Sequence, residues 1–147
     1  MIKNLSVAHY LQLNNFIQLN ALNLNLNNTI VNALIIDDEI DICYLLSSIL
    51  KKNNFKTTFV NKINDAVFSL KGNMPSIVFL DNHLPDGKGI DFIEYIKINC
   101  PHTKIVMISA HDSFLEKQKA IQNGADLFLS KPFSTAIINK AISSLFN

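Results

Sequence analysis

Three carboxylates, one hydroxyl and one ammonium group each stand at or just past the end of a short apolar run. They belong to Asp37, Asp38, Asp81, Ser109 and Lys131. Carboxylates are the usual protein ligands of Mg²⁺, while a hydroxyl and an ammonium group can bind phosphate oxygens. Three carboxylates held together repel one another unless a cation joins them. These residue types therefore indicate a site for a metal ion and a phosphate.

The apolar runs that precede these side chains are typical of buried parallel strands. They are short, rich in Val, Ile and Leu, and separated by segments of helix length. In a parallel sheet the carboxyl ends of the strands share one edge, where ligands bind. We therefore expect the five side chains to converge at one edge of a sheet.

From Val31 onward, strand and helix patterns alternate five times. We expect strands at about 31–36, 55–60, 76–80, 104–108 and 126–129, and helices at about 39–52, 64–70, 89–99, 112–123 and from 134 onward. Asp112 and Ser134 are the expected N-caps of the last two helices, and Gly72 is the expected stop of the second. This alternation with short connections predicts an α/β domain, residues 31–147, whose parallel sheet is covered by helices on both faces.

Residues 1–30 differ in character from the rest. Lys3 is their only charged side chain, and Asn and Leu dominate. Leu residues alternate with Asn over 22–27, which favours a strand, whereas apolar residues at helical spacing favour a helix. The helical set is Leu13, Phe16, Ile17 and Ala21. We expect an appended N-terminal arm, partly helical, that packs on the domain or on a second copy in a homodimer.

Composition excludes some classes of function. The 147 residues have a formal net charge of +1, and the 13 basic residues are all lysine, so direct nucleic-acid binding is not expected. No apolar run approaches the ~18 residues of a membrane span, and no basic region precedes an apolar stretch at the N-terminus. The two cysteines, Cys43 and Cys100, lack metal-ligand spacing and fit reduced thiols in a cytoplasmic protein.

With these motifs in place, residues 31–147 resemble a response-regulator receiver domain of two-component signalling, of the single-domain type seen in chemotaxis regulators. The matching segments are Asp37-Asp38-Glu39, Asp81-Asn82-His83-Leu84-Pro85-Asp86-Gly87-Lys88-Gly89, Ser109-Ala110, and Gly124 to Phe133. The resemblance implies a five-stranded, doubly wound, flavodoxin-like sheet of order 2-1-3-4-5.

The resemblance also implies roles for individual residues. Asp81 would be the phosphorylated residue. Asp38, Asp81 and the main-chain carbonyl of His83 would ligate Mg²⁺, with Asp37 acting through water. Lys131 would bind a phosphoryl oxygen.

Three further expectations come from the same resemblance. Ser109 would bind another phosphoryl oxygen. Its movement toward the phosphate would let the ring of Phe128 rotate inward, which makes a two-state switch. The face formed by the fourth helix, the fifth strand and the fifth helix would carry the output contacts. The Lys131–Pro132 peptide bond would be cis.

The implied function is a phosphorylation-dependent switch rather than an enzyme acting on other molecules. The phosphoryl group would come from a histidine kinase or a histidine phosphotransfer protein, and the output would be binding of a downstream protein or relay of the phosphate. One alternative is an interaction module that is never phosphorylated, although acceptor, metal and lysine residues are all present. Another is a phosphohydrolase with an aspartyl nucleophile, but such enzymes need an Asp where His83 stands.

Two histidines flank the expected phosphate. His83 lies two residues past Asp81, and His111 lies two residues past Ser109. The imidazoles could order or exclude the attacking water, so we expect them to set the lifetime of the acyl phosphate. The alternatives are solvated loop histidines, or a two-histidine metal site for which the sequence offers no third ligand.

Overall fold

A computed structural model describes residues 11–19 and 30–146, and the chain divides into two compact units, Met1–Ile30 and Val31–Asn147. In the first unit, residues 11–19 form a helix, so the helical pattern expected for Leu13, Phe16 and Ile17 is confirmed. The strand-like alternation at 22–27 and Ala21 lie outside the described residues.

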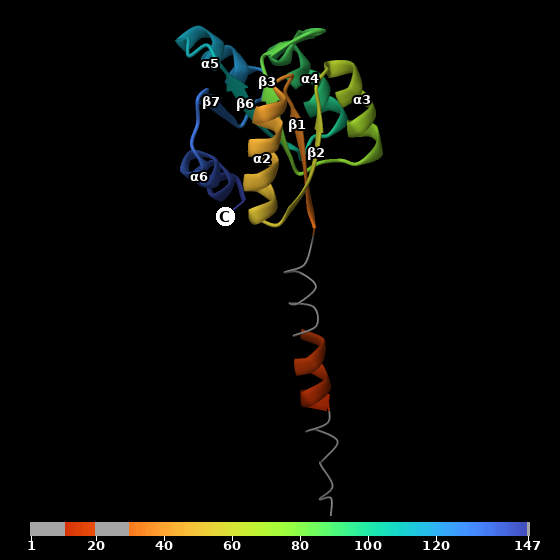
Figure 1. Ribbon diagram of the computed structural model, residues 1–147. Helices are drawn as coiled ribbons and strands as arrows, with labels where there is room; N and C mark the ends of the chain where they lie inside the picture. Colours follow the sequence, from red (N-terminus) through yellow and green to blue (C-terminus); the bar gives the residue numbers. More distant parts are fainter. Residues whose placement is uncertain (1–10, 20–29, 147) are drawn as a thin grey trace, which may run out of the picture. The chain divides into compact units, whose positions relative to one another are not determined.

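The second unit is built on a five-stranded parallel sheet (Figure 1). Its strands are β1 (Val31–Ile36), β2 (Phe55–Val60), β3 (Ile77–Asp81), β6 (Lys104–Ser109) and β7 (Leu127–Ser130). Their order is β2-β1-β3-β6-β7, and each neighbouring pair is parallel. Two short strands, β4 (His83–Leu84) and β5 (Gly87–Lys88), form a separate antiparallel hairpin. Without them, β6 and β7 are the fourth and fifth strands of the sheet, so its order is the expected 2-1-3-4-5. The flavodoxin-like fold is therefore confirmed.

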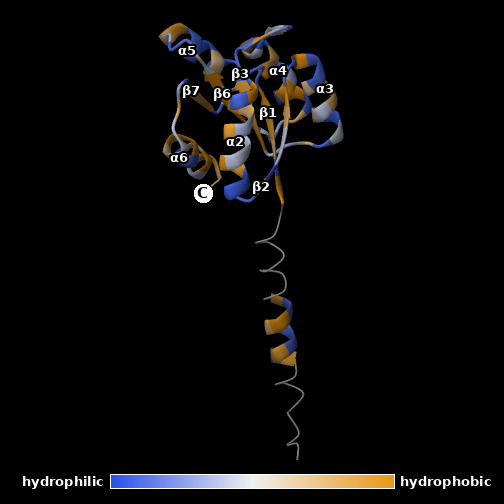
Figure 2. Cartoon of the chain, in the orientation of Figure 1, coloured by the Kyte–Doolittle hydropathy of each residue, from blue (hydrophilic) through white to orange (hydrophobic). Residues whose placement is uncertain are grey.

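Helices cover both faces of the sheet. They are α2 (Ile40–Lys52), α3 (Ile63–Gly72), α4 (Gly89–Asn99), α5 (Phe114–Gln122) and α6 (Thr135–Phe146). Helices α2 and α6 pack on one face, and α3, α4 and α5 pack on the other (Figure 1). Figure 2 shows hydrophobic strands in the centre, with helices of mixed hydropathy around them.

Alternating side chains of the central strands feed the two cores. Leu34 and Val78 face α3 and α4, whereas Ile35 and Phe79 face α2 and α6. All four side chains are buried, and each such burial stabilises the fold by roughly 1.5–3 kcal/mol. This double burial explains why β1 and β3 read as continuous apolar runs.

The structure corrects two local expectations and adds one element. Helix α3 runs through Gly72 instead of stopping before it. Helix α5 is capped by Ser113 rather than Asp112, because the Ser113 hydroxyl accepts a hydrogen bond from the Glu116 amide at 3.1 Å. The β4–β5 hairpin was not expected from the sequence, since two-residue strands carry no periodic pattern.

Candidate functional site

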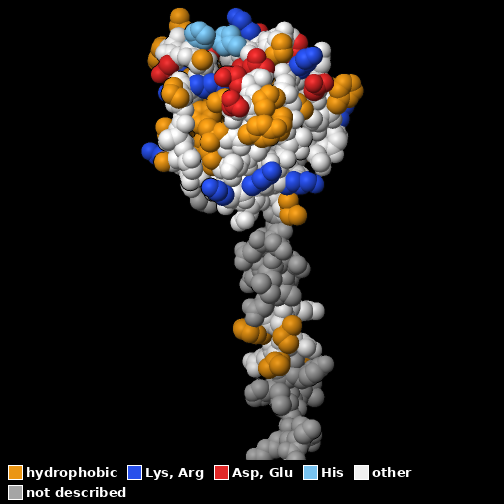
Figure 3. Space-filling model, in the orientation of Figure 1, with side chains coloured by type: hydrophobic (Ala, Val, Ile, Leu, Met, Phe, Trp, Pro, Cys, Tyr) orange, Lys and Arg blue, Asp and Glu red, His pale blue; other side chains and the backbone are white. Residues whose placement is uncertain are grey.

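Three carboxylates meet at the carboxyl ends of two neighbouring strands. Asp37 and Asp38 follow β1, and Asp81 ends β3, which pairs directly with β1. One carboxylate oxygen from each residue lies within 4.8 Å of the others. Asp37 and Asp81 are buried, whereas Asp38 is exposed. Figure 3 shows acidic side chains gathered at this end of the unit, with histidine side chains beside them. The expected convergence of the acids is therefore seen.

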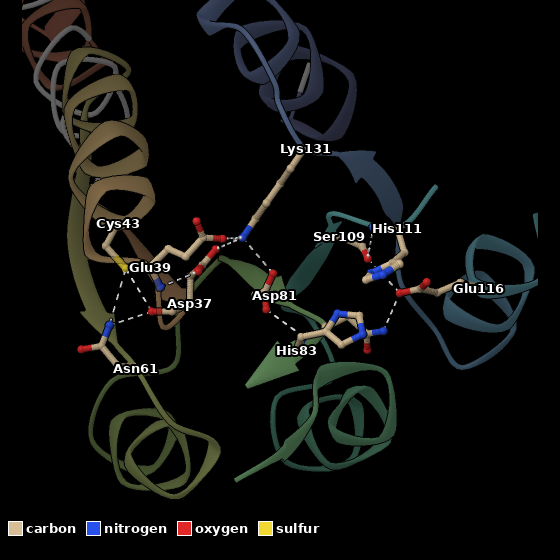
Figure 4. A network of polar contacts seen from close by, with 11 residues as sticks. Asp37, Glu39, Cys43, Asn61, Asp81, His83, Ser109, His111, Glu116 and Lys131 are labelled. Atoms are coloured by element: carbon tan, nitrogen blue, oxygen red, sulfur yellow. Dashed lines mark hydrogen bonds and ion pairs between the residues drawn. The ribbon is translucent and has the colours of Figure 1, made fainter. Parts of the chain in front are cut away.

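Lys131 reaches into the acidic cluster from the end of β7. Its Nζ atom lies 2.9 Å from Oδ2 of Asp37, 2.9 Å from Oδ1 of Asp81 and 2.7 Å from Oε1 of Glu39 (Figure 4). Burial alone would lower the pKa of Lys131, but its pairing with the three carboxylates outweighs burial and raises the pKa above its ordinary value. The lysine is therefore charged. The Lys131–Pro132 peptide bond that follows it is cis, as expected.

The charge balance of this cluster indicates that it fits a cation. Burial raises the pKa of Asp37, although pairing with Lys131 opposes the rise. Lys131 pairs with three carboxylates and Asp38 adds a fourth to the cluster, so the site carries excess negative charge. A hard divalent cation would offset that charge.

Asp37 is held in place through its own backbone. Its carbonyl accepts hydrogen bonds from Asn61 Nδ2 at 2.6 Å and from the Cys43 thiol at 3.3 Å. Its Oδ1 accepts the Glu39 amide at 2.9 Å. Burial, together with the charge of Asp37, raises the pKa of Cys43 to about 11, so Cys43 is a protonated structural thiol.

Asp81 is fixed by the loop that follows it. Its Oδ2 accepts a hydrogen bond from the His83 amide at 2.7 Å, which brings the His83 main chain beside the carboxylate. Gly89 donates its amide to Asn82 O at 2.9 Å, and a Cβ at Gly89 would stand 2.1 Å from Asp81 O. Only glycine allows this close approach. The metal-ligand role of the His83 carbonyl remains a prediction.

Ser109 lies at the same edge, but its hydroxyl is engaged elsewhere. Ser109 Oγ donates to Glu116 Oε1 at 2.9 Å and accepts from the His111 amide at 3.1 Å. In the view of Figure 4, Ser109, His111 and Glu116 lie on one side of Asp81, and Asp37 and Glu39 lie on the other.

The two histidines come together beside the acceptor. The ring centroids of His83 and His111 are 4.7 Å apart, with the rings tilted at 46°. Among the described residues, the cluster of Asp37, Asp38 and Asp81 is the only metal-like group of three His, Cys, Asp or Glu residues, so no third ligand joins the histidines.

Phe128 lies in the core. Its side chain is 9% exposed and packs on the α3–α4–α5 face of the sheet. The ring is therefore in an inward position while the Ser109 hydroxyl is bonded to Glu116. The expected exchange between Ser109 and Phe128 remains a prediction.

Three residues of the site were given no role from the sequence: Glu39, Asn82 and Glu116. Glu39 is the third acid in the run after β1, and that run was a usable signal. Glu116 stands three residues after Ser113, the spacing of a capping box. Its side chain nevertheless binds Ser109 and Asn82 instead of the Ser113 amide.

A sequence profile describing the response regulator receiver domain matches residues 33–143. The chain belongs to this family. The receiver domain is 32% identical over 112 residues to the response regulator protein PilR of Pseudomonas aeruginosa, covering 76% of this chain and 25% of PilR. It is 31% identical over 103 residues to the phosphate regulon transcriptional regulatory protein PhoB of Escherichia coli, covering 69% of this chain and 45% of PhoB.

Solved receiver domains share the fold. The solution structure of the beryllofluoride-activated NtrC4 receiver domain dimer has a TM-score of 0.75 and 34% identity, covering 78% of this chain and 95% of that one. By contrast, the chain spans less than half the length of PilR and PhoB.

Proposed function

We propose that this receiver domain is a signalling switch that accepts a phosphoryl group on Asp81. The observation that carries the proposal is the position of the Asp81 carboxylate. It is buried, its Oδ1 lies 2.9 Å from the ammonium group of Lys131, and one of its oxygens lies within 4.8 Å of carboxylate oxygens of Asp37 and Asp38. A nucleophilic carboxylate, a cation for the phosphoryl oxygens and a set of metal ligands are the parts that this reaction requires.

The chemistry follows from these parts. An oxygen of Asp81 attacks the phosphorus atom of a phosphohistidine, and a P–O bond forms as the P–N bond breaks. The electron pair of the P–N bond stays on the imidazole nitrogen, which takes up a proton. Lys131 binds one phosphoryl oxygen, and the Ser109 hydroxyl binds another.

A magnesium ion fits the same residues. Asp38, Asp81 and the main-chain carbonyl of His83 would hold it, with Asp37 acting through water. Bound there, Mg²⁺ supplies positive charge that offsets the repulsion between carboxylate and phosphoryl group. The clustering of three carboxylates, with one oxygen of each within 4.8 Å of the others, supports this assignment.

The donor in this proposal is a histidine kinase or a histidine phosphotransfer protein, and the output is a partner protein or onward relay of the phosphate. The predicted output face corresponds here to α5, β7 and α6. It exposes Phe114, Leu115 and Ile137, apolar side chains suited to a protein contact.

Among the described residues, no helix is long and apolar enough to cross a membrane.

The two alternatives are less well supported. An interaction module without phosphorylation does not need a buried acceptor paired with a lysine. A phosphohydrolase needs an acid where His83 stands, and the family match is to receiver domains.

Labelling with a small phosphodonor tests the proposal. The wild type is incubated with acetyl phosphate and Mg²⁺, and the intact mass is measured. We expect a Mg²⁺-dependent phosphoryl addition that EDTA abolishes and that Asp81→Asn lacks. Asp65→Asn, which changes an exposed acid on α3, serves as the matched control and should label normally. A folded wild type that takes up no phosphoryl group would contradict the proposal.

Assembly is a separate hypothesis. Residues 11–19 expose five large apolar side chains, which a homodimer contact could cover: Leu11, Leu13, Phe16, Ile17 and Leu19. Light scattering on the full chain and on a chain truncated to Val31 tests whether residues 1–30 control assembly. The same number of protomers per particle in both proteins would contradict that role.

A further inference from the structure

One carboxylate oxygen binds two buried donors at the edge of the phosphate site. Glu116 Oε1 accepts the Ser109 hydroxyl at 2.9 Å and also accepts the side-chain amide of Asn82 (Figure 4). Ser109 and Asn82 are both buried, at 0% and 4% exposure. They stand at the ends of β6 and β3, so a single oxygen ties the first turn of α5 to both strands.

This contact conflicts with the expected role of Ser109. A serine hydroxyl has one proton to donate. While that proton bonds Glu116, it cannot bond a phosphoryl oxygen on Asp81. Lys131 N donates to Ser109 O at 2.8 Å, so the backbone of Ser109 is fixed to β7 and the hydroxyl must rotate to change partner. A phosphoryl group also adds up to about two negative charges, which the Glu116 carboxylate would repel.

The rest of the α5 N-terminus does not depend on this side chain. The Glu116 amide donates to the Ser113 hydroxyl at 3.1 Å, which caps the helix through the backbone. Glu116 can therefore leave Ser109 and Asn82 without uncapping α5. Phe114 and Leu115, in the same turn, are exposed and would shift with it.

We propose that Glu116 is a positioning residue that competes with the phosphoryl group for the Ser109 hydroxyl, so that phosphorylation releases the first turn of α5. The inference rests on the proposed function and extends it, because it names the contact through which the acceptor site reaches α5. Glu116 holds the unphosphorylated arrangement by engaging the donor that the phosphoryl group needs.

The experiment measures the rate of phosphorylation by acetyl phosphate at fixed Mg²⁺. Glu116→Ala removes both contacts, and we expect a rate about tenfold higher, the size of one charge-assisted hydrogen bond. Glu116→Gln keeps an oxygen acceptor without the charge, retains the fold, and should give an intermediate rate. Glu94→Gln removes an exposed charge on α4 and should label at the wild-type rate.

A double-mutant comparison separates positioning from a structural effect. In a Ser109→Ala background, Glu116→Ala should accelerate labelling far less than it does in the wild type, because no hydroxyl remains to be released. A labelled wild type with unchanged rates in Glu116→Ala and Glu116→Gln would overturn the inference alone, as would an undiminished acceleration without the Ser109 hydroxyl. A folded wild type that never labels would overturn the proposed function, and this inference with it.

Discussion

The ammonium group of Lys131 lies 2.9 Å from Oδ1 of Asp81, whose carboxylate we propose as the phosphoryl acceptor. The same ammonium group also pairs with Asp37 and Glu39. Lys131 is thus the countercharge of the acids, and it is also the expected ligand of the incoming phosphoryl group. Because of these two roles, removing Lys131 should have opposite effects on metal binding and on phosphorylation.

Lys131→Ala should bind Mg²⁺ more tightly and accept phosphate more slowly. Removing the ammonium group leaves the acids uncompensated, so we expect the Mg²⁺ dissociation constant to fall by roughly threefold to tenfold. Phosphorylation should slow because a phosphoryl ligand is lost. Calorimetric titration measures the first effect, and acetyl phosphate labelling measures the second.

The matched control is Lys140→Ala, an exposed lysine on α6, which should change neither quantity. Weaker Mg²⁺ binding by Lys131→Ala would show that the lysine supports the metal site instead of competing with it.

Asp37→Asn should stabilise the metal-free protein. Burial raises the pKa of this carboxyl, so the ionised form is less favourable in the folded than in the unfolded chain at neutral pH. We expect the free energy of unfolding in EDTA to rise by about 1 kcal/mol. When Mg²⁺ replaces EDTA in urea unfolding, the free energy of unfolding should rise more for the wild type than for the variant. A variant that is less stable in EDTA would contradict this reasoning.

His83→Ala and His111→Ala should each shorten the life of the acyl phosphate. The rings lie 4.7 Å apart, and the His83 amide bonds Oδ2 of Asp81, so we expect the rings to keep water from a phosphoryl group on Asp81. After acetyl phosphate is removed, we expect the acyl phosphate of each variant to hydrolyse about threefold faster than that of the wild type. This corresponds to a hydrolysis barrier lower by ~0.7 kcal/mol. The exposed His102→Ala is the control. Identical decay in the wild type and in both variants would rule out a role for the histidines.

Asp126→Asn should weaken the fold at neutral pH but not in strong acid. Asp126 accepts the Ile105 amide at 2.8 Å and pairs with Lys97 and Lys104. Burial alone would raise the pKa of Asp126, but these partners outweigh it and hold the pKa below the ordinary 3.8. Stability from this group is therefore present above about pH 4 and is lost as pH falls through the lowered pKa.

We expect Asp126→Asn to lower the free energy of unfolding by ~1–2 kcal/mol at pH 7. The difference should narrow between pH 7 and about pH 2, as the pH falls through the lowered pKa of Asp126. Asp91→Asn, whose pair with Lys119 is exposed at 3.6 Å, should leave stability nearly unchanged. An equal loss for Asp126→Asn at both pH values would exclude an ionic origin.

The main features could be predicted because backbone pattern determines them. Apolar runs place the strands, and strand ends place Asp37, Asp81 and Lys131 at one edge. What could not be predicted depends on side-chain direction. Glu116 could have closed a capping box, but buried donors from two other elements attract it. Ser113 and Asp112 are adjacent and equally good caps, so only the structure distinguishes them.

The most direct test of the account identifies the atom that takes the phosphoryl group. The labelled wild type is reduced with borohydride, which converts an aspartyl phosphate to homoserine, and its peptides are sequenced by mass spectrometry. The account predicts homoserine at residue 81, in a Mg²⁺-dependent amount. Homoserine at Asp37, Asp38 or any other residue, with residue 81 unmodified, would contradict it.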